Sequence, residues 1–179
     1  MLLHWPIGRT WHNRRMGDPR WDDVRDIFVQ RGHDTLFRVV DTTASSWQAV
    51  FDLVRSRQWR YDYGEDGVAV PMPARATDIL ARADNDAFPI LWVWPDSILL
   101  AVFEPACAED VEFGIDLRQV QGQQRLDALW GFLRTIGQLL ERPVFMMRDG
   151  DGDTEEADLV YRPEVDRFMI LRPPPAGAA

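Results

Sequence analysis

The chain has 179 residues, a formal net charge of −9 and a hydrophobic content of 46%, which is enough for one globular domain with a substantial core. Its eight tryptophans and nine phenylalanines exclude general disorder. The longest unbroken apolar run, Ile98 to Phe103, is far shorter than the roughly 20 residues of a membrane span. We therefore expect no membrane partner, and the N-terminus lacks the continuous apolar segment of a secretory signal.

The numbers of cysteines and lysines exclude several kinds of functional site. A single cysteine, Cys107, excludes an internal disulfide and is typical of a reducing compartment, so we expect a cytoplasmic protein. All 20 basic residues are arginine, which excludes P-loop phosphate binding and Schiff-base chemistry because both need a lysine ammonium. An arginine-, alanine- and proline-rich chain without lysine indicates a GC-rich, bacterial-type genome.

Residues 1–17 form a basic and aromatic N-terminal arm in the sequence. They contain Trp5, Arg9, Trp11, His12, Arg14 and Arg15, with no acid before Asp18. Aromatic side chains can stack on nucleic-acid bases, and arginines between them can attract the phosphates. Three arginines are too few to overcome the repulsion expected from a net charge of −9. We therefore expect the arm to dock on the protein and predict no nucleic-acid partner. A single domain over 18–172 and a disordered Pro/Ala tail over 173–179 follow.

Four stretches have the apolar spacing of three to four residues that is typical of amphipathic helices, and they span 19–31, 44–57, 75–84 and 123–141. Asp18 followed by Pro19 predicts the start of the first, because an N-cap residue precedes a proline at the first helical position. The stripe from Leu126 to Leu140 in the last helix is wide and must be buried.

Apolar runs and period-two alternation predict strands over 36–40, 59–63, 68–70, 88–94, 98–103, 110–116, 143–148, 157–161 and 167–171. Gly64 and Gly67 bracket one hairpin turn. The second hairpin, 88–103, is nearly continuously apolar, so we expect its strands to be central and covered on both faces. Trp92 and Trp94 point to one side, as core residues or, alternatively, as an exposed aromatic floor for a ligand.

These elements predict an α+β fold: a mainly antiparallel sheet of about seven to nine strands packed by about four helices. Residues 35–70 and 110–161 share the order strand, helix, strand, Gly/acid turn, strand. Two pseudo-repeated β-α-β-β units around one sheet are therefore a plausible design, although residue identity between them is too low to prove duplication.

The acidic residues are concentrated in two runs that contain no arginine. The first run, 104–116, carries Glu104, Glu109, Asp110, Glu112 and Asp116. The second, 149–158, carries Asp149, Asp151, Asp153, Glu155, Glu156 and Asp158. Together the two runs carry a formal charge of −11, so the remaining residues carry a formal charge of +2. Such a field repels nucleic acid and attracts cations or basic protein surfaces.

The second run opens with Asp149, Asp151 and Asp153 separated by glycines, like the start of a calcium loop. The match fails further on, because Thr154 stands at the turn-glycine position and Val160 where a bidentate acid is expected. A solvated hairpin turn is the preferred interpretation, a protein contact the second, and a divalent cation the third.

In the first run, alternation places Val111, Phe113 and Ile115 inward and Asp110, Glu112 and Asp116 outward. This row could hold Mg²⁺ or perform acid–base catalysis, but no histidine or cysteine adjoins the row to complete such a site. The alternatives are a charged edge strand that resists aggregation and a surface read by a basic partner.

Nucleophilic and zinc chemistry have little support. None of the four serines lies in a Gly-x-Ser-x-Gly context, and no histidine lies near Cys107 in the sequence, so a Cys/His pair could form only by folding. One cysteine and scattered histidines do not form a zinc motif. We therefore predict no cofactor, with a divalent cation at Asp149, Asp151 and Asp153 as the exception to test.

Three functions are compatible with these observations. The first is a non-enzymatic acidic binding protein for a basic protein partner, which resembles immunity or antitoxin-type inhibitors in size and charge alone. Its contact residues would be Asp110, Glu112, Asp116, Asp149, Asp151, Asp153, Glu155 and Glu156. The second is a metal-dependent enzyme that uses either carboxylate group, and the third is a scaffold subunit with an exposed patch of Trp5, Trp11, Trp92 or Trp94.

Overall fold

The computed structural model describes residues 17–31, 35–82, 88–148 and 154–171. Its helices are α1 (Trp21–Arg31), α2 (Ala44–Ser56), α3 (Ala76–Leu80) and α4 (Gln123–Leu140), with short 3₁₀ helices η1 (Leu117–Gln119) and η2 (Thr154–Glu156). Its strands are β1 (Thr35–Val39), β2 (Arg60–Glu65), β3 (Val68–Ala69), β4 (Pro89–Trp94), β5 (Ala101–Phe103), β6 (Val111–Ile115), β7 (Val144–Met146), β8 (Leu159–Arg162) and β9 (Arg167–Ile170). The predicted α+β class is confirmed.

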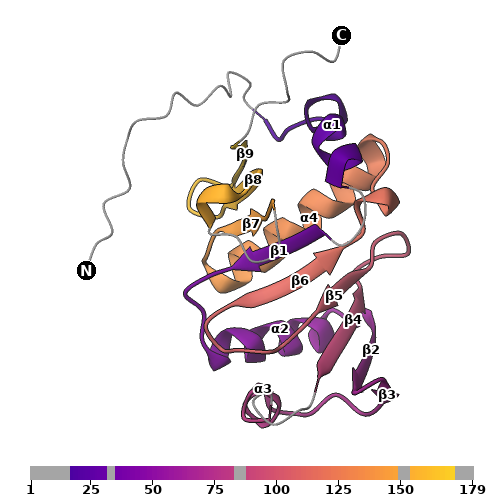
Figure 1. The fold of residues 1–179 in the computed structure, drawn as a ribbon, viewed down its shortest axis with the longest axis vertical. Coiled ribbons are helices and arrows are strands. Elements are labelled where there is room, and N and C mark those ends of the chain that lie inside the picture. Colours follow the sequence, from indigo (N-terminus) through magenta and orange to yellow (C-terminus); the bar gives the residue numbers. More distant parts are fainter. Residues whose placement is uncertain (1–16, 32–34, 83–87, 149–153, 172–179) are drawn as a thin grey trace, which may run out of the picture.

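The nine strands form one antiparallel sheet in the order β3-β2-β4-β5-β6-β1-β7-β8-β9 (Figure 1). β1 and β6 pair near its middle, with Phe37 opposite Phe113. Both segments predicted as β-α-β-β units have that order of elements, namely β1-α2-β2-β3 and β6-α4-β7-β8. The β2–β3 pair and the β7–β8 pair lie on opposite sides of the central β1–β6 pair. β1 from the N-terminal half lies between β6 and β7 from the C-terminal half, so the two halves of the chain interlock there.

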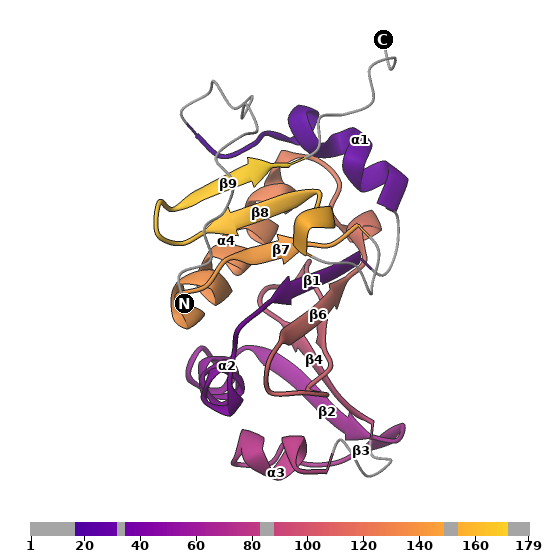
Figure 2. The same ribbon diagram turned by 60° about the vertical axis from the view of Figure 1, so that its left-hand side comes forward.

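The four α-helices cover one face of the sheet (Figure 2). The opposite face carries a second, smaller buried cluster over β7 and β8, and in the described part of the chain it is uncovered over β4, β5 and β6. In β1 and β6 every second side chain is buried, and the buried ones pack with residues of α2 and α4 in one core. β4 alternates in the same way, so its second face is only half-buried. The expectation that β4 and β5 are covered on both faces is therefore wrong, because within the described residues the second face carries no helix over these strands.

An aromatic cluster joins the central strands to α4. The Phe113 ring stacks on Phe37 with centroids 5.4 Å apart and contacts Phe103 at 4.9 Å. Phe132 of α4 meets Phe113 edge to face at 5.5 Å. Each such pair is worth about 0.5–1.5 kcal/mol beyond the burial of area, so the cluster fixes which face of β6 points to the helices.

Helix α1 begins at Trp21 rather than at Pro19 as the cap pattern predicts. The Asp18 carboxylate accepts a hydrogen bond from the Arg134 guanidinium at 2.8 Å, and the Pro19 carbonyl accepts one from the Trp130 indole at 2.9 Å. Both donors belong to α4, so contacts distant in sequence hold Asp18 and Pro19 outside the helix.

Arg134 also connects α4 to the turn between β8 and β9. Its guanidinium donates to the Asp166 carboxylate at 2.6 Å, and the Tyr161 hydroxyl donates to the same oxygen at 2.9 Å. These two donors hold the pKa of Asp166 below its usual value. Burial, followed by the neighbouring Asp166, raises the pKa of Tyr161. The network therefore ties the chain before α1, α4 and the last hairpin together.

Two glycines of α4 provide a matched test of this packing. A methyl group on Gly137 would lie 2.6 Å from the buried Tyr161 ring, which its hydroxyl contact to Asp166 holds in place. A methyl group on Gly131, which is exposed, would meet nothing within 4 Å. We expect Gly131→Ala to raise the free energy of unfolding by up to about 1 kcal/mol through helix propensity. Gly137→Ala should lower it, because overpacking costs about 1–3 kcal/mol.

Urea unfolding followed by circular dichroism measures both changes. Equal stabilisation by the two substitutions would contradict the close packing of α4 on Tyr161.

Candidate functional site

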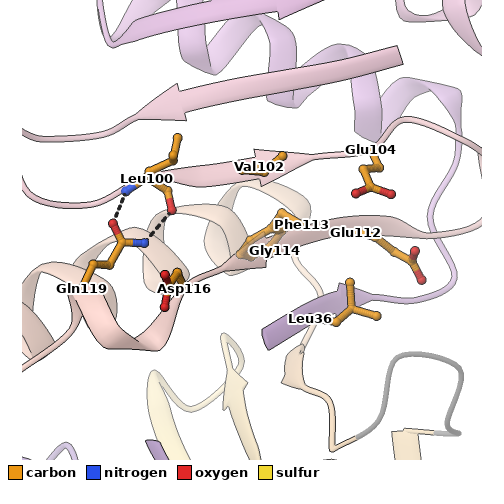
Figure 3. A pocket seen from close by; sticks show the side chains of 9 residues that line it. All are labelled: Leu36, Leu100, Val102, Glu104, Glu112, Phe113, Gly114, Asp116 and Gln119. Atoms are coloured by element: carbon orange, nitrogen blue, oxygen red, sulfur yellow. Dashed lines mark hydrogen bonds between the residues drawn. The ribbon is translucent and has the colours of Figure 1, made fainter. Parts of the chain in front are cut away.

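The uncovered face of the sheet is hollowed over β5, β6 and β1 (Figure 3). The depression has a volume of about 330 Å³. Apolar atoms and one glycine form its floor, and polar side chains stand at its two ends. The lining residues are Leu36, Leu100, Val102, Glu104, Glu112, Phe113, Gly114, Asp116 and Gln119.

Gly114 makes the hollow. Strand register places Val102, Gly114 and Leu36 in one row across β5, β6 and β1. A Cβ atom built on Gly114 would meet no atom within 4 Å, so the missing side chain leaves open space between its two neighbours. Glycine inside a strand often marks a place where another molecule approaches closely.

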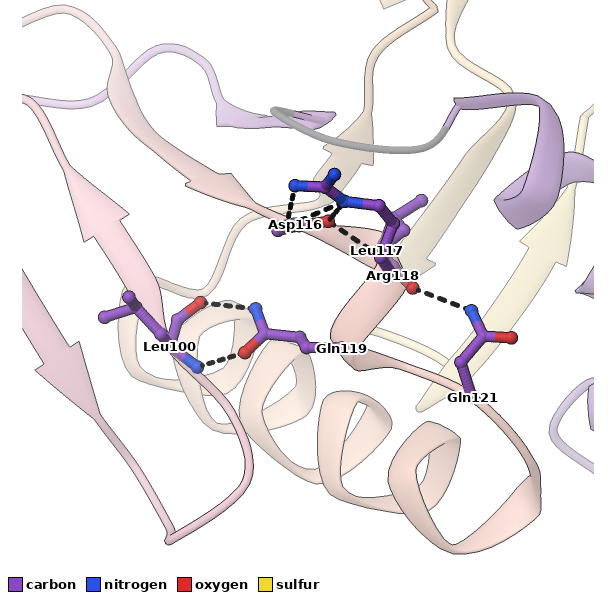
Figure 4. Close-up of polar contacts among 6 residues, drawn as sticks. All are labelled: Leu100, Asp116, Leu117, Arg118, Gln119 and Gln121. Atoms are coloured by element: carbon purple, nitrogen blue, oxygen red, sulfur yellow. Dashed lines mark hydrogen bonds and ion pairs between the residues drawn. The ribbon is translucent and has the colours of Figure 1, made fainter.

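Glu112 and Asp116, which stand at opposite ends of the depression, are each held by an arginine. Arg38 of β1 lies directly opposite Glu112 and donates to its carboxylate at 2.5 Å. Asp116 caps η1 by accepting the Arg118 backbone N–H at 2.9 Å, and it also binds the Arg118 guanidinium at 2.7 Å (Figure 4). The acid run that contains no arginine in sequence is therefore partly neutralised by arginines from β1 and η1.

Three further acids of this run differ from Glu112 and Asp116. Among the described residues, Glu104, Glu109 and Asp110 have no arginine within ion-pair distance. Glu104 stands at the same end of the depression as Glu112 (Figure 3). Asp110 precedes β6 and does not line the depression, and its backbone carbonyl accepts a hydrogen bond from the Trp47 indole at 3.1 Å.

Gln119 closes the end of the depression opposite Glu104 and Glu112 (Figure 3). Its side-chain amide accepts from the Leu100 N–H at 2.9 Å and donates to the Leu100 carbonyl at 3.0 Å (Figures 3 and 4). This pair of bonds replaces a neighbouring strand for Leu100 and holds the residues that lead into β5 beside η1. The end wall is thus built by the η1 turn, which the sequence patterns did not predict.

The tryptophans of β4 extend the apolar surface toward β2. Asp62, Trp92 and Val102 continue the row of Gly114 across the sheet, and Trp92 and Trp94 are both half-buried on this face. The Trp92 ring lies over Gly64, and the Arg60 guanidinium lies 4.1 Å from the Trp94 ring centre. Both tryptophans are therefore half-buried, so they are neither core residues nor a fully exposed aromatic floor.

The second acid run is described only in part. Asp149, Asp151 and Asp153, the candidates for metal binding, lie outside the described residues. Glu155 and Glu156 belong to η2, and Glu156 is exposed. Asp158, counted with this run from the sequence, is buried and pairs with Arg148 at 3.2 Å. It therefore adds nothing to an acidic surface.

The described ranges contain no group of three His, Cys, Asp or Glu side chains able to hold a metal ion. They also contain no helix with the length and hydropathy needed to cross a membrane. Comparison of the chain with protein-family models, with curated proteins and with solved structures finds no match. The site must therefore be interpreted from its own geometry.

The metal-dependent alternative has a direct test. We expect millimolar Mg²⁺, Mn²⁺ or Ca²⁺ to leave the Tm unchanged, because Glu112 and Asp116 are each engaged by an arginine. Differential scanning fluorimetry measures this, with EDTA-treated protein as the reference. A rise in Tm that is lost in Asp149→Asn/Asp151→Asn/Asp153→Asn protein would contradict this expectation and place a metal in that loop.

Proposed function

We propose that the chain is a non-enzymatic binding protein whose uncovered sheet face, around the depression at Gly114, contacts a basic region of a partner protein. The observation that carries this proposal is the composition of the depression. Its floor is apolar, and carboxylates stand at both ends with no basic side chain in its lining. Apolar area with a charged rim is the usual arrangement of a protein-binding surface.

Electrostatics favour a basic partner. Glu104 lines the depression at the same end as Glu112 and has no arginine partner in the described part of the chain, and like charges held together oppose folding. A complementary surface removes this repulsion and also steers association. Glu112 and Asp116 keep their arginines, so they contribute less to the field than their number in the sequence implies.

The class of partner follows from the same charge argument. A bacterial, cytoplasmic chain of this size and acidity is suited to neutralising a basic protein, as an immunity or antitoxin-type inhibitor does. The scaffold alternative has weaker support, because Trp92 and Trp94 are half-buried and Trp5 and Trp11 lie outside the described residues. The enzyme alternative also has less support, because Glu112 and Asp116 are each paired with an arginine.

The proposal is tested by affinity capture from a lysate of the source organism at low and then at high salt. We expect a basic protein to be captured at low salt and released at high salt. Glu104→Gln/Glu112→Gln/Asp116→Asn should lose it, because these are the three carboxylates that line the depression. Gly114→Leu should also lose it, because a leucine side chain fills open space in the depression.

The matched control neutralises three exposed acids elsewhere, in Asp22→Asn/Asp78→Asn/Glu141→Gln protein. It changes the net charge equally and should retain the partner. Capture that survives the first two variants, or that the control abolishes to the same extent, would contradict a contact at this face.

A further inference from the structure

The depression at Gly114 is a slot that runs along β6. Val102 of β5 and Leu36 of β1 are the cross-strand neighbours of Gly114 and form the two walls. Neighbouring strands lie about 4.8 Å apart, so the backbones that carry the two walls are about 10 Å apart. Glu112 and Asp116 are each two residues from Gly114, which gives the slot a length of about 13 Å along the strand. These dimensions suit one extended side chain.

The Asp116 end of the slot is already neutralised. Asp116 uses both carboxylate oxygens to bind Arg118, with Nε 2.9 Å from Oδ1 and Nη2 2.7 Å from Oδ2 (Figure 4). Gln119 uses its side-chain oxygen and its side-chain nitrogen to bind the backbone of Leu100. A ligand with a cationic group at each end therefore gains little from this end.

The opposite end has one negative charge in excess. The Glu104 N–H donates to the Glu112 carbonyl at 3.4 Å, so these residues are neighbours across β5 and β6, and both side chains line the slot (Figure 3). Arg38 donates to one carboxylate oxygen of Glu112, Oε1. Within the described residues Glu104 forms no ion pair. Two carboxylates and one guanidinium leave a formal charge of −1, which one further cationic group would balance.

We propose that a single arginine of the basic partner anchors in this slot. Its aliphatic stem lies along Gly114 between Leu36 and Val102, and its charged head lies between Glu104 and Glu112. This proposal rests on the proposed function and makes it more specific, because it names the residue type that the depression recognises.

Arginine suits the slot better than lysine. The guanidinium has five N–H donors in a planar fork, so it can bind two neighbouring carboxylates, and it is more weakly hydrated than an ammonium. Its stem gains from contact with apolar walls, as long basic side chains do elsewhere. Arginines in partly desolvated pockets are also among the residues that contribute most to protein–protein affinity.

Methyl NMR of the full chain tests the proposal with N-acetyl-L-arginine methylamide as the probe, at constant ionic strength. We expect saturable shifts at Leu36 and Val102, and none at Leu129 in the core. The lysine analogue should bind at least about threefold more weakly, because an ammonium cannot bridge both carboxylates in this way. The citrulline analogue has a head of the same shape without the charge, and it should give no saturable shift.

Variants locate the probe in the slot. Glu104→Gln should weaken binding up to about fivefold, as expected for a partly exposed ion pair. Glu104→Gln/Glu112→Gln should abolish the saturable shift. Gly114→Ala should also weaken binding, because the added methyl group, which meets no protein atom within 4 Å, occupies the slot. Glu156→Gln neutralises an exposed acid elsewhere and should bind like the wild type. Circular dichroism melts establish that each variant is folded.

No saturable shift with the arginine probe overturns the proposal. So does equal binding of the lysine or citrulline analogue, or wild-type affinity in Glu104→Gln. These results are distinct from a failure of the proposed function. A partner captured through this face without probe binding overturns the arginine anchor alone. Probe binding without any captured protein supports a guanidinium site and contradicts the proposed function.

Discussion

Burial of Phe113 beneath α4 is the contact on which the arrangement of the sheet depends. Phe113 is in ring contact with Phe37, Phe103 and Phe132, which come from β1, β5 and α4. Side chains alternate along a strand, so placing Phe113 on the helix side sends Glu112 and Gly114 to the other side. A slip of one residue would bury a carboxylate and a glycine and expose the aromatic ring, which excludes that register.

The surface features of the molecule follow from this alternation. Because Phe37 lies opposite Phe113, Arg38 must lie opposite Glu112 on the uncovered face. Their side chains are only 17% and 29% exposed, so the attraction between the two charges is offset by the cost of removing them from water. The effect of the ion pair is to lower the negative field at one end of the depression, where Glu104 has no arginine partner in the described part of the chain.

Local patterns in the sequence predicted the elements well. All nine strands and four helices exist at or near the expected positions, and the Asp66–Gly67 turn has the positive φ angles, 53° and 78°, that a tight hairpin requires. Two element bounds differ from the predictions. α3 ends at Leu80 rather than near residue 84. β5 begins at Ala101, because Asp96 and Gln119 accept hydrogen bonds from the backbone of residues 98–100 in place of a neighbouring strand.

The site was harder to predict because its parts are distant in sequence. Arg38 and Glu112 are separated by 74 positions, and no local pattern relates them. Glu112 and Asp116 were expected to face outward, and they do, but their arginine partners and the end wall at Gln119 depend on sheet order and on η1. Gly114 between two outward acids was the one local signal of a hollow, since a strand interior otherwise disfavours glycine.

Contact of a partner with the uncovered face around Gly114 is tested most directly by methyl NMR of the chain, titrated with a basic protein identified by the affinity capture. We predict shifts for the methyl groups of Leu36, Leu100 and Val102, which line the depression, and none for Val50 and Leu129 in the core beneath the helices. Unchanged methyl signals at Leu36, Leu100 and Val102 in the presence of saturating partner would contradict contact at this face.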